Sequence, residues 1–240
     1  MKKILFLSLF VSTVSLASPD VPTLKLEYSY ALDWYCPLQV VPETLTPAQA
    51  ALIPKIPIYR DQELLAKISW FQSEWDKQGT PLLAAAAHAI GKPYPMKEIS
   101  GALFLCPRLP FMGTPLSFNV ISYLNLSAKD IPALGGRPMP VFFFVSTAFH
   151  EVLHKYIYSI LEKSPSTVLK TLHTNLDSLY GAHLHLFALQ KKVFTDLRLE
   201  RLLPAVGKLE ASHGSEYLRA WKTVHQDEGT YQSLLSELRN

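Results

Sequence analysis

Hydrophobic residues recur at helical spacing in the first half of the chain. From Asp61 to about Gly79 the pattern predicts one amphipathic helix. Its apolar positions lie three or four residues apart and are Leu64, Leu65, Ile68, Phe71 and Trp75. An alanine-rich run over 82–90, which stops before Gly91 and Pro93, predicts a second helix. We interpret both helices as scaffold.

The most apolar stretch after the first residues leads into a third predicted helix, over 141–162. Its first part, 141–145, is also compatible with a buried strand when it is taken alone. Ser164 is a suitable N-cap and Pro165 a suitable first helical residue, so we expect a further long helix from there to about Phe194. The two helices would form a hairpin with a tight turn.

Other segments have the patterns of strands. Alternation with a period of two over 23–30 predicts a half-buried strand, and 101–105 and 116–126 are strand-like runs separated by prolines and a glycine. The last of these could pair along its edge with an extended substrate. Two helices, over 216–224 and 230–238, are expected to end the chain.

The first residues have the pattern of an export signal. Two lysines precede an apolar run over 4–16, and Ser15 and Ala17 are the small residues that signal peptidase requires before a cut at Ser18. We therefore predict a signal peptide over 1–17 and a periplasmic or secreted protein. The apolar run is too short for an ordinary transmembrane helix, so we expect no stable membrane insertion after cleavage.

The rest of the chain is long enough for one large domain, over 61–240, with an N-terminal extension over 18–60 that packs on it. The net charge of +3 includes the two lysines of the signal, and the other charges are scattered rather than gathered in basic runs. This argues against nucleic acid as a partner.

The two cysteines, Cys36 and Cys106, form an even pair in a chain that we expect to be exported. A disulfide between them would stabilise the fold by about 4 kcal/mol in the chain-entropy model. The alternative is two buried free thiols. Neither cysteine lies at metal-ligand spacing from another cysteine or a histidine.

The motif His150-Glu151-Val152-Leu153-His154 lies within the third predicted helix. In a helix His150 and His154 project from one face, which lets two imidazoles hold one Zn²⁺ at about 2.0 to 2.1 Å. Zinc lowers the pKa of a coordinated water toward about 7, so Glu151 can accept its proton. The two intervening residues and the two that precede the motif, 148–149, are uncharged, so these polar side chains need partners in a buried segment. A metal ion supplies them.

These residues resemble the HExxH motif of the zincin metallopeptidases, in which both histidines bind zinc and the glutamate is the general base. The resemblance covers residues 146–160, and Lys155 stands where the family commonly has an apolar residue. The glycine and third histidine that follow the motif in metzincins are absent, so the resemblance is gluzincin-like and implies a third ligand from a later helix. The expected fold is α+β and zincin-like, predominantly helical, with a small antiparallel sheet and the HExxH helix at its centre.

Four residues are candidates for the third ligand, because the next predicted helix has no glutamate before Glu200. They are His183, His185, Asp177 and His173. We favour His183 because it lies on an apolar helical stripe and within a cluster of small residues, whereas His185 falls on another face. Equal path lengths along the two helices from Ser164 would instead place Asp177 or His173 nearer the motif.

The residue that stabilises the oxyanion could be Tyr180, His225 or Tyr231, although a structural role is the stronger interpretation of each. The sequence as a whole predicts a zinc metallohydrolase, a peptidase whose substrate is a peptide or protein. Two alternatives are a non-catalytic, zincin-like envelope-binding protein and a zinc amidase that acts on cell-wall material. The intact Glu151 favours catalysis, because a structural zinc site does not need it.

Overall fold

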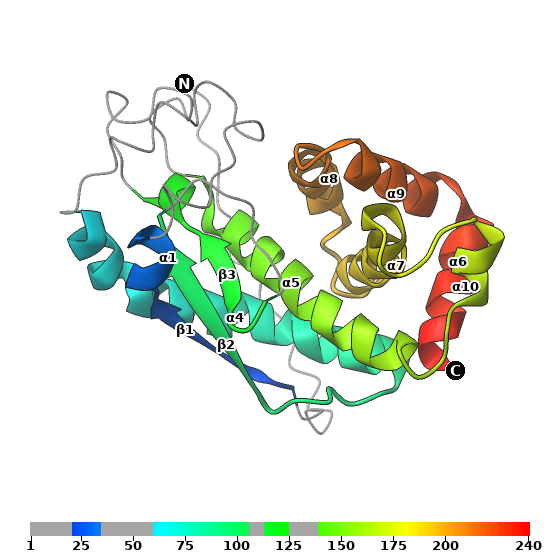
Figure 1. Ribbon diagram of the computed structural model, residues 1–240, viewed down its shortest axis with the longest axis horizontal. Helices are drawn as coiled ribbons and strands as arrows, with labels where there is room; N and C mark the ends of the chain where they lie inside the picture. Colours follow the sequence, from blue (N-terminus) through cyan, green and yellow to red (C-terminus); the bar gives the residue numbers. More distant parts are fainter. Residues whose placement is uncertain (1–20, 35–59, 106–112, 125–138) are drawn as a thin grey trace.

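The computed structural model describes residues 21–34, 60–105, 113–124 and 139–240. The predicted signal peptide, Cys36 and Cys106 lie outside these residues. In the described part of the chain, three strands form one sheet in the order β1-β2-β3, and both pairs are parallel (Figure 1). The strands are β1 (Thr23–Tyr28), β2 (Glu98–Phe104) and β3 (Leu116–Asn119). The expectation of an antiparallel sheet was wrong.

The described helices outnumber the strands, as the hydrophobic pattern predicted. They are α1 (Tyr30–Trp34), α4 (Arg60–Ile90), α5 (Val141–Leu161), α6 (Thr167–Thr171), α7 (Leu179–Asp196), α8 (Leu203–Ala211), α9 (Ser215–Gln226) and α10 (Glu228–Arg239), with 3₁₀ turns at Ile121–Tyr123 and Glu200–Leu202. Within this part of the chain, no helix combines the length and apolar composition that crossing a membrane requires.

The parallel pairing of β1 with β2 follows from the long helix between them. Parallel neighbours need a crossover connection of a dozen or more residues, usually a helix, and α4 supplies it. In β1 the side chains of Leu24 and Leu26 are buried, as the alternation predicted. The strand expected over 116–126 is shorter, because β3 gives way to the 3₁₀ turn after Asn119.

Helix α4 joins the two helices that were expected over 61–79 and 82–90. Gly79 does not end it: a Cβ there would lie 2.3 Å from the ring of Trp75, so the glycine makes room for that buried side chain. Pro81 lies inside the helix. Burial of one face of the helix along its length outweighs the local preference of these two residues to interrupt it.

Helix α5 has nearly the predicted bounds and runs between the sheet and the C-terminal helices (Figure 1). On the sheet side, the Phe144 ring of α5 packs against α4 and β3. Its centroid lies 4.8 Å from that of Phe71 in α4 and 5.9 Å from that of Phe118 in β3. On the other side α5 packs against α7. The HExxH segment is therefore central in the fold.

The single helix expected from Ser164 to Phe194 is wrong, because the structure divides it into α6 and α7. Ser166, not Ser164, caps α6, and His173 follows its end in the left-handed conformation, with φ of 53°. Ser178 then caps α7 by accepting a hydrogen bond from the Gly181 amide. Gly181 has no room for a Cβ, which would lie 1.9 Å from the Asn175 carbonyl oxygen. This tight turn sets where α7 begins.

The last two predicted helices are confirmed as α9 and α10, each slightly longer than expected. Helix α8 was not predicted. Pro204 lies in its first turn, where proline is tolerated, and Gly207 allows close packing, because a Cβ there would lie 2.6 Å from the Trp221 ring of α9.

Candidate metal centre

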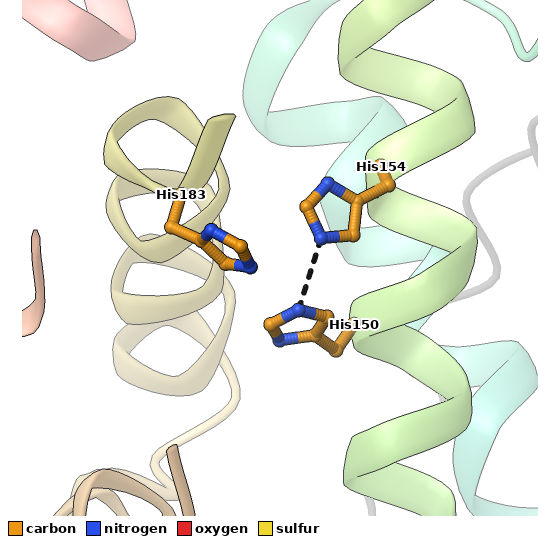
Figure 2. Close-up of side chains that lie close together, drawn as sticks. All are labelled: His150, His154 and His183. Carbon is orange, nitrogen blue, oxygen red and sulfur yellow. Dashed lines mark hydrogen bonds between the residues drawn. The ribbon is translucent and has the colours of Figure 1, made fainter. Parts of the chain in front are cut away.

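Three histidine rings converge between α5 and α7. Figure 2 shows His150 and His154 projecting from α5 toward His183 of α7. One ring nitrogen of each can be chosen so that all three lie within 4.8 Å of one another, and His150 Nε2 is 3.1 Å from His154 Nε2. Two nitrogens on a tetrahedral zinc are about 3.3 Å apart. The spacing therefore fits a shared metal ion, as does the burial of His150 and His183.

The other ring nitrogens explain which atoms face the centre. Nδ1 of His150 lies 3.1 Å from the Glu210 carboxylate, and Nδ1 of His183 lies 2.5 Å from the Leu179 carbonyl oxygen. Both partners are acceptors, so each Nδ1 carries hydrogen and leaves the Nε2 lone pair free. The buried Nε2 of His183 has no hydrogen-bond partner among the described residues. A metal ion at the centre would supply the partner that a buried nitrogen needs.

The protonation of His154 and His183 also suits a metal, because ligation requires neutral imidazole and the pKa values of both are lowered. Burial, together with the neighbouring His150 and His183, holds the pKa of His154 well below its usual range. Burial and His150 lower the pKa of His183 to about 4. Burial by itself lowers the pKa of His150, but the carboxylates of Glu210 and Glu151 raise it above its ordinary value.

Glu151 lies beside the histidines in a pocket of about 340 Å³. The same pocket is lined by His154, His183 and Tyr217. Burial raises the pKa of the Glu151 carboxyl to about 7, against the opposing effect of His150. A carboxyl with a pKa near neutrality can both accept and return a proton at neutral pH.

The sequence interpretation missed Glu210, which lies in the unpredicted helix α8. Its carboxylate is buried and contacts the first histidine of the motif, His150. A signal existed: Val206 and Gly207 lie four and three residues before Glu210, on the same side of the helix, and these three are the buried residues of α8. A carboxylate on a buried helical stripe needs a partner, and here the partner is a histidine that faces the candidate centre.

Tyr217 of α9 was also missed. Its ring centroid lies 4.1 Å from that of His183, and its side chain lines the pocket. Burial, with the carboxylates of Glu151 and Glu210, raises the pKa of the phenol to about 12, so it remains a hydrogen-bond donor at neutral pH. Tyr217 is one helical turn before Ala220 and two before Val224, both buried, which marks its face of α9 as inward.

The other candidate ligands lie apart from the converging set. Asp177 lines the pocket but is exposed and is not among the three side chains whose ligand atoms converge. His173 is exposed beyond the end of α6. His185 is fully buried, and its Nε2 lies 2.9 Å from Glu237. Path lengths favoured Asp177 and His173 only under the assumption of a continuous helix from Ser164.

The three residues considered for the oxyanion do not line this pocket. The Tyr180 hydroxyl bonds to Thr223, His225 stacks on Trp221, and Lys191 lies over the ring of Tyr231. Their contacts are structural.

Comparison of the chain with protein-family models, curated proteins and solved structures finds no match. The side chains of the site are therefore the basis for inferring function. They combine three converging imidazoles, a buried carboxyl with a pKa near neutrality and a phenol that can donate a hydrogen bond.

Proposed function

We propose that the protein is an exported, zinc-dependent hydrolase that cleaves peptide bonds. The observation that carries the proposal is the convergence of His183 with the two histidines of the motif beside Glu151, at a buried Nε2 that has no hydrogen-bond partner among the described residues. Three protein ligands with a further position open are typical of catalytic zinc. Zinc, when bound, would lower the pKa of a coordinated water and polarise the substrate carbonyl.

The side chains of the chain would perform the remaining steps. Glu151 accepts a proton from the attacking water and returns it to the leaving amine, for which a pKa of about 7 is suitable. Tyr217 donates a hydrogen bond to the negative charge that develops on the carbonyl oxygen. Glu210 fixes the orientation of the His150 ring through Nδ1.

Two features of the sequence support the same proposal. The HExxH motif resembles that of zincin peptidases, in which the equivalents of His150, Glu151 and His154 have these roles. The predicted signal peptide over 1–17 would place the enzyme in the periplasm or outside the cell.

The test measures zinc content and hydrolysis of a mixed peptide library on the same purified samples. Wild type is expected to hold about one zinc per chain and to cleave peptides. Glu151→Gln should keep the zinc and lose activity by about 10²- to 10⁴-fold, because only the proton acceptor is removed. Glu162→Gln is the matched control: it changes an exposed glutamate at the end of the same helix and should leave both unchanged.

Other outcomes would contradict peptide hydrolysis in distinct ways. Zinc without cleavage of any peptide would favour the non-catalytic envelope-binding protein. Zinc with cleavage of cell-wall amides alone would favour the amidase. A wild type that holds no zinc after reconstitution would contradict the metallohydrolase as a class.

A further inference from the structure

The pocket beside the histidines has a largely apolar wall. The residues that form it come from α5, from α7 and from the turn before α7, and they are Ile157, Tyr158, Leu176, Leu179 and Ala182. Tyr158 is 41% exposed and Leu179 is 58% exposed. Large apolar side chains that face solvent together at a pocket are typical of a binding surface rather than of an ordinary protein exterior.

The positions of Tyr158 and Leu179 follow from those of the histidines. Tyr158 lies one helical turn after His154 on α5, and Leu179 lies one turn before His183 on α7. The packing that brings His154 and His183 together therefore also brings this apolar pair to one place, beside the candidate centre. A group bound between Tyr158 and Leu179 would be adjacent to a carbonyl at the histidines.

The charges of the pocket limit what can bind there. None of the described residues that line it is Lys or Arg, and its only acidic side chains are Glu151 and Asp177. A substrate carboxylate would thus meet no lysine or arginine among the described lining residues and would face the exposed Asp177. The volume of about 340 Å³ lies near the lower end of the range for small-molecule sites, which suits one large side chain with its neighbouring amide.

We propose that this pocket is a specificity subsite that binds a large apolar side chain, of the leucine or phenylalanine class, next to the bond that is cleaved. Tyr158 and Leu179 form its contact surface, and Asp177 disfavours acidic residues. The inference rests on the proposed function for the bond that is cleaved, but selective binding can be measured without catalysis.

The experiment measures dissociation constants by calorimetry with the inactive Glu151→Gln variant. The ligands are short, blocked peptides that differ only at one central position, which is Leu, Phe, Ala, Lys or Glu. The Leu and Phe peptides should bind about 10- to 100-fold more tightly than the Ala peptide, as expected for burial of one large apolar side chain. The Glu peptide should bind most weakly. Each series is measured with zinc and after its removal.

Substitution of the two exposed pocket residues tests whether they cause the preference for Leu over Ala. Leu179→Ser and Tyr158→Ser, each combined with Glu151→Gln, should reduce the advantage of Leu over Ala to less than about threefold, with zinc content unchanged. Both replaced side chains are exposed, so the fold should be retained. Leu65→Ser is the matched control, since it removes an exposed leucine of α4 outside the pocket and should not alter the preference.

The possible failures can be distinguished. Equal binding of the Leu and Ala peptides, no binding of any peptide, or a preference that survives both serine variants would overturn the apolar subsite, even in an active zinc enzyme. A protein without zinc that still prefers Leu and Phe through Leu179 would support the subsite and contradict the hydrolase.

Discussion

Two histidines of α7, two positions apart, face different surroundings although both are buried. Nε2 of His183 has no hydrogen-bond partner among the described residues and faces His150 and His154. Nε2 of His185 lies 2.9 Å from a Glu237 oxygen. Two positions along a helix correspond to a rotation of about 200°, which explains why the rings point in opposite directions.

Both carboxylate oxygens of Glu237 in α10 accept hydrogen bonds. Besides His185, its carboxylate accepts from the hydroxyl of Ser166, from the amide and hydroxyl of Thr167 and from the amide of Val168. Burial by itself raises the pKa of Glu237, but these hydrogen bonds hold it well below its ordinary value. The carboxylate therefore ties the start of α6 to α7 and α10, and its role is structural.

The comparison shows what separates a candidate ligand from a structural histidine. A glutamate partner does not distinguish the two kinds of histidine, because His150 contacts Glu210 and His185 contacts Glu237. Nor does an unpartnered ring nitrogen, since Nδ1 of His185 also lacks a partner in the described part of the chain. The distinguishing feature is convergence with ring nitrogens from a second helix. His150 and His183 show it, and His185 does not.

The largest expected effect separates the two histidines of α7. His183→Ala should weaken zinc binding by more than about 100-fold, because it removes a ligand rather than an outer partner. His185→Ala should leave zinc affinity within about threefold and should instead lower the free energy of unfolding. Zinc titration and urea unfolding on both variants measure this, with His185→Gln as a milder replacement. Loss of zinc in His185→Ala alone would reverse the assignment.

The next effect concerns stability. Glu237→Ala should lower the free energy of unfolding by about 2 to 4 kcal/mol, because the start of α6 and the buried His185 lose their acceptor. Zinc affinity should not change. Glu228→Ala, which removes an exposed glutamate of the same helix, is the control and should have little effect on urea unfolding. A similar small loss in both variants would contradict the structural role.

A smaller effect, on zinc affinity, should distinguish Glu210 from Glu237. Glu210→Gln should weaken zinc binding by about tenfold, because the amide is a poorer acceptor for Nδ1 of His150. Glu237→Gln should leave zinc affinity unchanged. Competition with a fluorescent zinc chelator measures both. Equal zinc affinities in the two variants would mean that Glu210 does not act through His150.

The smallest effect is a dependence on pH in the metal-free protein. Because folding lowers the pKa of Glu237, its contribution to stability is present above the ordinary value of 4.5 and is lost as the pH falls below it. The free energy of unfolding should therefore decrease from about pH 5 downward, and less steeply in Glu237→Gln. Parallel curves for the two proteins would show that other carboxyl groups cause the decrease.

Much of the centre followed from local patterns in the sequence. His150, Glu151 and His154 lie within one helix, so their spacing alone defined their common face. Helix α5 was predictable because its apolar run is long and continuous. His183 was chosen for its place on an apolar stripe, which requires no knowledge of where its helix begins.

The errors concern relations between segments. The path-length estimate failed because the turn before α7 depends on the contact between Gly181 and the Asn175 carbonyl. The long helix between β1 and β2 is the feature of the sequence that indicates a parallel pair, which the expectation of an antiparallel sheet did not take into account. Glu210 and Tyr217 reach the centre only through the packing of α8 and α9 on each other and of α9 on α7, which spacing within one segment does not reveal.

The division of ligands between α5 and α7 gives a metal ion a mechanical role as well as a chemical one. His154 and His183 come from helices that are separated in the chain by α6 and two turns, so an ion held by both would act as a reversible cross-link. A ligand that binds only the folded state stabilises it in proportion to the logarithm of its free concentration. The melting temperature of the protein would then rise with the free zinc concentration, and a chelator that removes the ion would lower it.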